Sequence, residues 1–199
     1  MPTGTALRDP RDQLFAAAER ILLRAGPSGL TSRAVTSEAG CAKGVLHRHF
    51  ADFDAFLAEL VLDRVLRIGD QADALRAAAG TGTVAGLLTS ALTEVFGPVA
   101  LAILGLVTFR DDLRARLRLV TPAGLPVLTE AAAMIAAYLG VEQDLGRVPA
   151  EADVDTLALT LIGAGHLLFA GRPGATPDEA AVRKVVAAVM AGAAREAPA

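Results

Sequence analysis

The sequence has few of the residues that catalytic and metal sites use most often. Its 199 residues include one cysteine, one tyrosine, three histidines and no tryptophan. A single cysteine excludes an internal disulfide framework, and Cys41 stands where a small hydrophobic residue is expected. The sequence contains neither a glycine-rich phosphate loop, nor a nucleophile elbow, nor a paired-carboxylate motif. We therefore expect no enzymatic activity, no catalytic residue and no cofactor.

The histidines leave little room for metal chemistry. His47 and His49 lie in a basic N-terminal segment, so His166 is the histidine left for the rest of the chain. It stands in the apolar run GAGHLLFAG, with no cysteine or carboxylate at metal-ligand spacing. We expect no metal site, and His166 is either a structural histidine or a polar group of a ligand pocket.

Long hydrophobic runs are also missing. The two longest uncharged runs, residues 95–109 and 156–171, are shorter than the roughly 18 residues that indicate a transmembrane helix. The N-terminus is polar and does not resemble a signal peptide. We expect a cytoplasmic protein without a membrane partner, in which these runs form buried helices.

The charge is divided unevenly along the chain. Residues 1–50 hold seven Lys/Arg and four Asp/Glu, a net charge of +3, which leaves −6 for the rest because the whole chain carries −3. A basic N-terminal part and an acidic remainder suit a small domain that approaches a polyanion. With 53% hydrophobic residues, the chain can bury a substantial core and is not disordered.

Two short helices joined by a glycine turn are predicted within residues 29–50. Thr31 can cap the first helix, and Gly40 can take the positive φ that reverses the chain. A second helix is expected over residues 42–49, and its outer surface carries Lys43, His47 and Arg48. A charged outer face alone is typical of solvated surface, but this order of parts favours a helix-turn-helix that enters the major groove of DNA.

Residues 11–57 resemble the DNA-binding domain of the TetR family of transcriptional regulators. The resemblance rests on the glycine after the first helix and on four short motifs, namely Gly26, Thr31, Ala39-Gly40, Lys43-Gly44 and His47-Arg48-His49-Phe50. It implies an all-α chain, with an N-terminal three-helix helix-turn-helix domain and a C-terminal helical ligand-binding and dimerisation domain. The positions that it places at DNA are Thr31, Arg33, Ala42, Lys43, Val45, His47 and Arg48.

Four residues depart from the family pattern. Thr36 stands where alanine is common, and Ala42 replaces a hydroxyl cap of the recognition helix, a loss of roughly 1 kcal/mol. His47 and Phe53 replace a tyrosine and a lysine that commonly contact the DNA backbone. These departures imply fewer phosphate contacts than are usual in the family.

Periodicity and helix breakers divide the chain into about nine helices. We expect them over residues 9–25, 31–39, 42–49, 52–79, 83–96, 103–119 in one or two pieces, 125–139, 149–170 and 176–194. Asp52 and Thr83 are expected caps, Pro149 is expected to open a helix, and residues 176–179 form a capping box. The predicted domains are residues 1–52 and 53–199, with the helix from Asp52 packing on both.

Two further sites are expected in the C-terminal domain. The last two helices carry small or branched apolar residues at spacings of three and four, and such residues allow two helices to pack closely. We therefore expect these helices to form the contact of a homodimer, as the family resemblance also implies. The residues are Gly163, Ala164, Gly165, Ala181, Val185, Ala188 and Gly192. Ordinary core packing is the alternative for them. A pocket for an apolar or amphipathic small molecule is expected around Leu92, Thr93, Phe96, Thr108, Phe109, Met134, Tyr138 and His166, with ordinary packing as the alternative for each.

Together these observations predict a homodimeric transcriptional regulator. Its partners are expected to be double-stranded operator DNA, a second copy of the chain and a small-molecule effector, and repression released by that effector is the expected mode. The alternative is a helical interaction or enzyme domain with a degenerate N-terminal head that does not bind DNA, an interpretation favoured by Thr36, Ala42 and Phe53.

Overall fold

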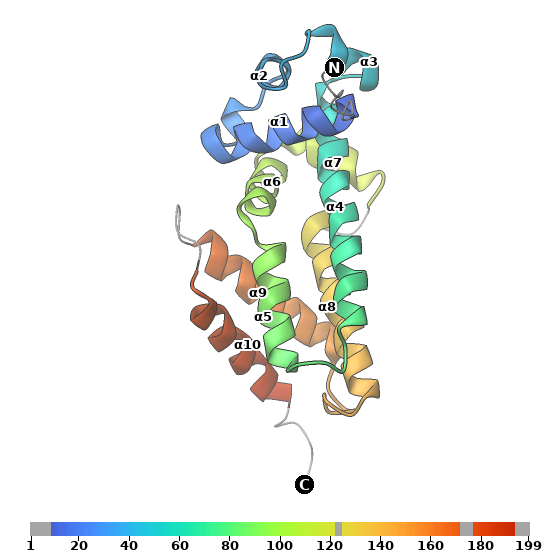
Figure 1. Cartoon of the computed structure of the whole chain (residues 1–199), viewed down its shortest axis with the longest axis vertical. Helices are drawn as coiled ribbons and strands as arrows, with labels where there is room; N and C mark the ends of the chain where they lie inside the picture. The colour runs from blue at the N-terminus through green and yellow to red at the C-terminus, as the bar shows by residue number, and fades with distance from the viewer. Residues whose placement is uncertain (1–8, 122–124, 172–176, 194–199) are drawn as a thin grey trace, which may run out of the picture. The chain divides into compact units, whose positions relative to one another are not determined.

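The computed structural model describes residues 9–121, 125–171 and 177–193, and in these ranges the chain is all-α. The described residues form ten α-helices and one 3₁₀ turn (Figure 1). These are α1 Pro10–Ala25, η1 Pro27–Gly29, α2 Ser32–Glu38, α3 Gly44–His49, α4 Phe53–Ala77, α5 Val84–Val95, α6 Pro98–Phe109, α7 Asp111–Arg118, α8 Pro126–Asp144, α9 Val154–Ala170 and α10 Glu179–Ala193. The all-α prediction is therefore confirmed, and the count is ten because the segment 98–118 forms two separate helices.

Side-chain caps explain where several helices begin. Thr31 accepts a hydrogen bond from the backbone N–H of Ala34 (3.2 Å), and Thr83 accepts one from Gly86 (3.1 Å). Asp52 accepts one from Ala55 (2.6 Å) at the start of α4. The caps predicted at Thr31, Asp52 and Thr83 are confirmed, because each depends only on residues three positions apart.

Three predicted helix starts need correction, those of α3, α6 and α9, and α6 begins at Pro98 and not at residue 103. Pro149 does not open a helix; α9 begins at Val154, where Asp153 accepts a hydrogen bond from the N–H of Thr156 (3.0 Å). The turn around Pro149 is held instead by Gln143, whose amide donates to the carbonyl oxygen of Pro149 (2.7 Å) and to two further carbonyls.

At α10 the capping group is Asp178, which accepts a hydrogen bond from the N–H of Ala181 (2.7 Å). Thr176, the expected cap, lies outside the described residues. Helix α3 begins at Gly44, two residues later than expected, and Lys43 at its N-cap position makes no side-chain capping bond.

The chain forms two compact units. The first contains the described residues of Met1–Leu62 and Ala102–Pro122, and the second those of Asp63–Leu101 and Ala123–Ala199. The first unit thus takes in the start of α4 and the segment 102–121 in addition to the helix-turn-helix, whereas the sequence placed residues after 52 in the second domain. Helices α4 and α6 each contribute residues to both units.

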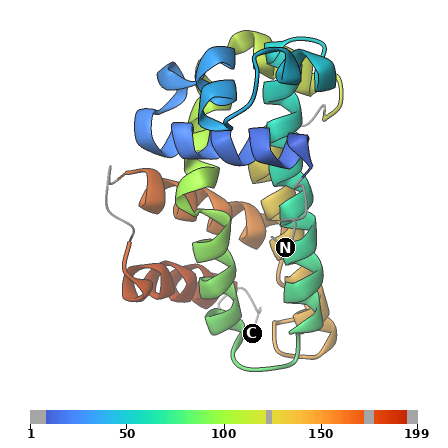
Figure 2. The ribbon, with the colours of Figure 1, turned by 45° about the horizontal axis from the view of Figure 1, so that its top comes forward.

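Each unit has its own apolar core. In the first unit, α1 packs on α2 and α3 through fully buried side chains that include Leu14, Ala18, Val35 and Leu46. In the second unit, α5, α8, α9 and α10 pack against one another (Figure 2). Their core includes Leu88, Leu92, Ile135, Leu139, Leu161 and Val186.

Candidate DNA-binding face and internal cavity

The turn between α2 and α3 has the geometry that its glycine allows. Gly40 has φ of 66°, a left-handed conformation that a side chain would strain. The N–H of Cys41 then donates to the carbonyl oxygen of Thr36 (3.0 Å), which closes the end of α2. Thr36 is buried, and its hydroxyl is within hydrogen-bonding distance of the carbonyl oxygens of Ser32 (3.0 Å) and Arg33 (3.2 Å). The threonine at this position is therefore accommodated within α2.

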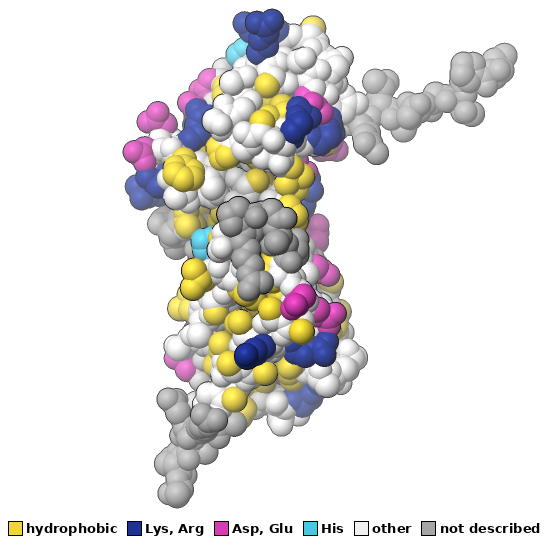
Figure 3. Space-filling view, turned by 90° about the vertical axis from the view of Figure 1, so that its left-hand side faces the viewer, with side chains coloured by type: hydrophobic (Ala, Val, Ile, Leu, Met, Phe, Trp, Pro, Cys, Tyr) yellow, Lys and Arg dark blue, Asp and Glu magenta, His cyan; other side chains and the backbone are white. Residues whose placement is uncertain are grey.

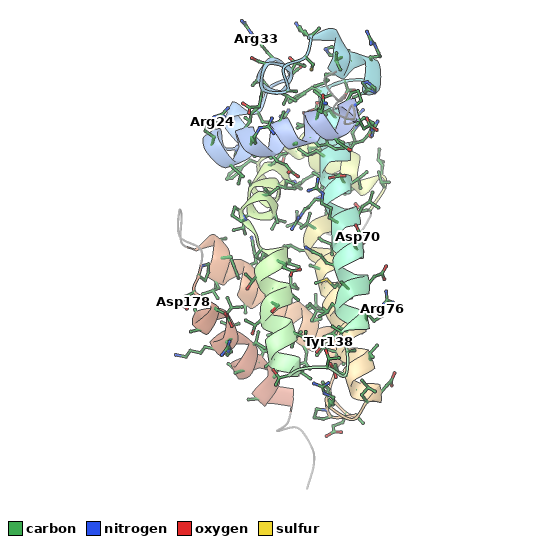
Figure 4. All side chains as sticks on the ribbon, viewed as in Figure 1. Arg24, Arg33, Asp70, Arg76, Tyr138 and Asp178 are labelled. Carbon is green, nitrogen blue, oxygen red and sulfur yellow. The ribbon has the colours of Figure 1, made fainter. Side chains whose placement is uncertain are left out.

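The residues predicted to contact DNA lie on the outside of this helix pair. Side chains of Thr31, Arg33, Ala42, Lys43, His47 and Arg48 are exposed, and Val45 is half-buried. Figure 4 shows Arg33 extending away from α2. The structure thus gathers the predicted positions on α2, on α3 and at the two helix starts, although DNA contact itself stays a prediction.

Three arginines on α1 of the same unit are already paired. Arg20 and Arg24 share the carboxylate of Glu38 on α2, at 2.8 Å and 3.0 Å. The hydrogen bonds from these two arginines lower the pKa of Glu38. Arg11 pairs with Glu59 on α4, and its guanidinium lies 4.7 Å from the centre of the Phe50 ring. These arginines hold α1 to its neighbours.

The basic side chains of α2 and α3, unlike the arginines of α1, form no ion pairs within the described residues. Within the described part of the chain, Arg33, Lys43 and Arg48 have no side-chain hydrogen bond and no ion pair. All three are exposed. Among the basic side chains of α1, α2 and α3, those of α2 and α3 are therefore available to an external partner, while those of α1 are used internally.

Helix α7 fixes the start of α4, directly after the recognition helix. Both carboxylate oxygens of Asp52 accept hydrogen bonds from Arg116, at 2.7 Å and 3.2 Å, while Arg110 donates to Asp54 at 3.0 Å. The bond from Arg116, together with the backbone N–H of Ala55, lowers the pKa of Asp52 to about 2. No local pattern in the sequence predicts this anchor, because its partners are 56 and 64 residues apart.

Four phenylalanines form a cluster beneath the face. Phe50 and Phe56 meet edge to face with ring centroids 5.1 Å apart, and both contact Phe15. Phe53 stacks on Phe56 at 5.7 Å, with the guanidinium of Arg110 6.0 Å from its ring. The aromatic residue at position 53 therefore packs within this unit.

The second unit contains a cavity of about 170 Å³ between α4, α5 and α8. Its lining residues are Gln71, Ala74, Leu75, Ala78, Leu87, Ser90, Ala91, Glu94 and Met134. Met134 is the predicted pocket residue among them. No motif surrounds the polar lining groups Gln71, Ser90 and Glu94, so the sequence gives no signal for them.

The other predicted pocket residues lie elsewhere. Leu92, Phe96 and Tyr138 are buried in the core of the second unit, Thr93 is exposed, and His166 is half-buried with its ring 6.0 Å from that of Phe96. Thr108 and Phe109 belong to the first unit, where both are exposed, and Phe109 lies beside Pro27 and Leu30 with 81% of its surface accessible.

Tyr138 takes part in a buried polar network of the second unit. Its hydroxyl donates to Oε1 of Glu142 (2.7 Å), a fully buried carboxylate that also accepts from the N–H of Gly80 (3.2 Å) and pairs with Arg147 (3.2 Å). Burial and this hydrogen bond raise the pKa of Tyr138. Arg147 also donates to the carbonyl oxygen of Gly82 (2.7 Å), so the network ties the α4–α5 connection to the end of α8.

The small residues predicted at the dimer interface occupy different environments. Gly163, Ala188 and Gly192 are exposed, whereas Ala164, Ala181 and Val185 are half-buried. Gly165 is buried within the chain, where an added Cβ would lie 2.7 Å from a ring carbon of Phe96. Leu159 and Leu167 flank Gly163 on α9 and are 65% and 76% exposed. Figure 3 shows that hydrophobic and uncharged side chains cover much of the surface on the side of the second unit that carries α9 and α10.

The described residues were also compared with the requirements of a metal site and of a membrane-spanning helix. No group of three or more His, Cys, Asp and Glu side chains there is placed to hold a metal ion. No single helix there is both long and apolar enough to span a membrane, and only the bent pair of α5 and α6 passes that test together.

Comparisons with known proteins bear on this geometry. Residues 14–60, which include the helix-turn-helix, match the family model of bacterial regulatory proteins of the tetR family. A putative TetR-family transcriptional regulator from Mesorhizobium loti has 16% sequence identity and a TM-score of 0.70, over 95% of this chain and 96% of that one. No curated protein sequence matches the chain.

Two structures of regulators named FadR share the fold at similarly low identity. FadR from Bacillus halodurans is 16% identical with a TM-score of 0.72, over 94% of this chain and 98% of that one. FadR from Bacillus subtilis, solved in complex with stearoyl-CoA, is 14% identical with a TM-score of 0.67, over 91% and 98%. The segment that carries the exposed basic face therefore matches the model of the tetR family of bacterial regulatory proteins, and the chain shares its fold with these solved regulators.

Proposed function

We propose that the chain is a homodimeric transcriptional repressor whose binding to operator DNA is weakened by a small molecule. The observation that carries the DNA part is the division of the basic side chains. Arg33, Lys43 and Arg48 are exposed and unpaired within the described residues, and they lie on the two helices of the helix-turn-helix. Such side chains bind phosphates and base edges without first breaking an internal ion pair.

A second copy of the chain supplies the second head that a two-fold operator requires. The exposed stripe of Leu159, Gly163 and Leu167 on α9 supports this, because its spacing of four residues places uncharged surface along one side of the helix. The adjoining helix α10 exposes Ala188 and Gly192. We propose that α9 and α10 of two copies form the dimer contact.

The dimer contact is tested by placing a charge on it. Leu167→Glu and Ala188→Glu should each shift the protein from dimer to monomer in light scattering, because a desolvated charge without a partner costs several kcal/mol. Ala137→Glu, at an exposed position of α8, is the control and should remain dimeric. Dimers for both α9 and α10 variants would move the interface to another surface.

The ligand response is proposed to act through the cavity of the second unit. Its lining is mostly apolar with three polar groups, a composition typical of small-molecule sites. Helix α4 lines this cavity and also has residues in the unit that carries α3, so we propose that it transmits the effect of the ligand to that unit. Since such coupling is reciprocal, an effector that weakens DNA binding tenfold, about 1.4 kcal/mol, binds tenfold less tightly to the DNA complex.

The experiment that tests the DNA function starts from a random duplex library, because the operator sequence is unknown. Repeated selection with the purified protein should enrich a near-palindromic site with half-sites about one helical turn or slightly more apart. Lys43→Ala and Arg48→Ala should each weaken binding to the enriched duplex. If the protein is a folded dimer and still enriches no sequence, the result would favour the alternative that the N-terminal domain does not bind DNA.

A further inference from the structure

The lining of the cavity contains a buried acceptor that lacks a donor. Oε1 of Gln71 is inaccessible to solvent and has no hydrogen-bond partner among the described residues. A buried carbonyl oxygen without a partner carries an unrecovered desolvation cost, which a ligand N–H group would remove. Because Gln71 lies in the wall of the cavity, a donor bound there is within its reach.

The same cavity has an acidic rim. Of the nine lining residues, Glu94 is the ionisable one, and its exposed carboxylate has no hydrogen bond or ion pair within the described ranges. A guanidinium nitrogen of Arg64 donates to the backbone carbonyl of Glu94 (3.3 Å), so it bonds the main chain and is not itself a lining residue. The charged side chain offered to a ligand is therefore a carboxylate.

The size of the cavity limits the apolar part of the ligand. A cavity of roughly 150 Å³ with an apolar lining holds one benzene ring, and this one measures about 170 Å³. A long acyl chain with a nucleotide head, such as the stearoyl-CoA bound to FadR of Bacillus subtilis, does not match this volume or the charge of the rim.

We propose that the cavity binds a small organic amine with one ring-sized apolar group. Its ammonium donates to Oε1 of Gln71 and faces the carboxylate of Glu94, while the apolar group fills the space lined by Leu75, Leu87 and Met134. This inference rests on the proposed function, since it names the chemical class of the effector at that site. Amine recognition here needs both the acceptor inside the cavity and the acid at its rim.

Three probes of matched size test the proposal on the full-length protein. Phenethylamine, phenethyl alcohol and phenylacetate differ in charge and not in their apolar ring, and binding is measured by calorimetry at pH 7. The amine should bind about tenfold more tightly than the alcohol, because a hydrogen bond to a charged donor is the stronger one. The carboxylate probe should bind most weakly, because the rim repels it.

Variants locate the binding. Glu94→Gln should weaken amine binding about fivefold and leave alcohol binding unchanged, whereas Glu130→Gln, the same change on exposed surface of α8, should alter neither. Gln71→Leu should weaken amine binding and also raise the melting temperature of the free protein, because it removes an unpaired buried acceptor. A Gln71→Leu protein with lower thermal stability and unchanged amine affinity would refute the role of Gln71.

The remaining outcomes separate this inference from the proposed function. Equal or tighter binding of the alcohol or phenylacetate, or no binding of any probe at millimolar concentration, would overturn the amine assignment while DNA binding by the same preparation stands. Amine binding that leaves DNA affinity unchanged would keep the amine site and refute the ligand-responsive part of the proposed function, because a ligand that does not distinguish two states cannot shift them.

Discussion

The salt dependence of DNA binding should distinguish basic side chains that the structure leaves free from those that it pairs. Arg33→Gln and Lys43→Gln each remove an exposed, unpaired charge from the helix-turn-helix face. Arg24→Gln removes a charge that already pairs with Glu38 at 3.0 Å. All three variants change the net charge equally, so a long-range effect of charge would be the same in each.

The magnitude follows from the release of counterions. Each phosphate neutralised contributes about −0.9 to the slope of log K against log salt concentration, so three free cations predict about −2.7 for each head. Two heads predict about −5.4, and a substitution present in both heads should reduce this by about 1.8. For Arg24→Gln the expected change is close to zero.

Fluorescence anisotropy of a labelled duplex, titrated at several salt concentrations, measures this slope. The reasoning is refuted if Arg24→Gln lowers the slope as much as Arg33→Gln does, because ion pairing within the unit would then not decide which charges meet DNA. A parent slope much steeper than about −5.4 would show that cations outside these three take part.

Three further predictions concern stability. The pKa of Asp52 is lowered to about 2, so its ionised carboxylate stabilises the fold fully above pH 3.8, the usual pKa of an aspartate. This stabilisation is lost as the pH falls from 3.8 to about 2, so the urea midpoint should drop over that range and change less in Asp52→Asn. Tyr138→Phe should cost about 1–3 kcal/mol in chemical unfolding by removing a donor from a buried carboxylate. Because the pKa of Tyr138 is raised, its contribution is present below pH 10.0 and declines above it, a decline that the variant should lack. Gly165→Ala, whose Cβ would meet Phe96 at 2.7 Å, should destabilise by about 1–3 kcal/mol, whereas Gly140→Ala, with nothing within 4 Å, should not.

The parts of the fold that could be predicted from sequence are those that depend on near neighbours. A threonine cap bonds an N–H three residues away, so Thr31 and Thr83 were identified without tertiary information. The start of α9 could not be placed in the same way. Pro149 and Asp153 both stand where a helix can begin, and the choice depends on Gln143, which holds the backbone of the turn from the preceding helix.

Local sequence patterns predict even less of the DNA-binding face and of the cavity. The exposed positions of α3 follow from helical periodicity within six residues. Whether an arginine is free or paired depends on contacts such as Arg20 with Glu38, 18 residues away, or Arg116 with Asp52, 64 residues away. The cavity is a harder case, because its polar groups come from separate helices whose packing no local pattern specifies.

Because half of the described basic side chains of each head form internal ion pairs, we expect DNA binding to depend strongly on dimerisation. A head with three free cations has a small electrostatic contribution to binding, since roughly half of its described basic side chains already hold the unit together. Two heads on one palindrome double that contribution, and the second head binds at the high effective concentration that its partner creates. Loss of dimerisation by Leu167→Glu should therefore weaken operator binding more than loss of any one cation. If the monomeric variant kept the affinity of the parent, the three free side chains of a single head would suffice for recognition, and the proposed α9–α10 contact would have no part in it.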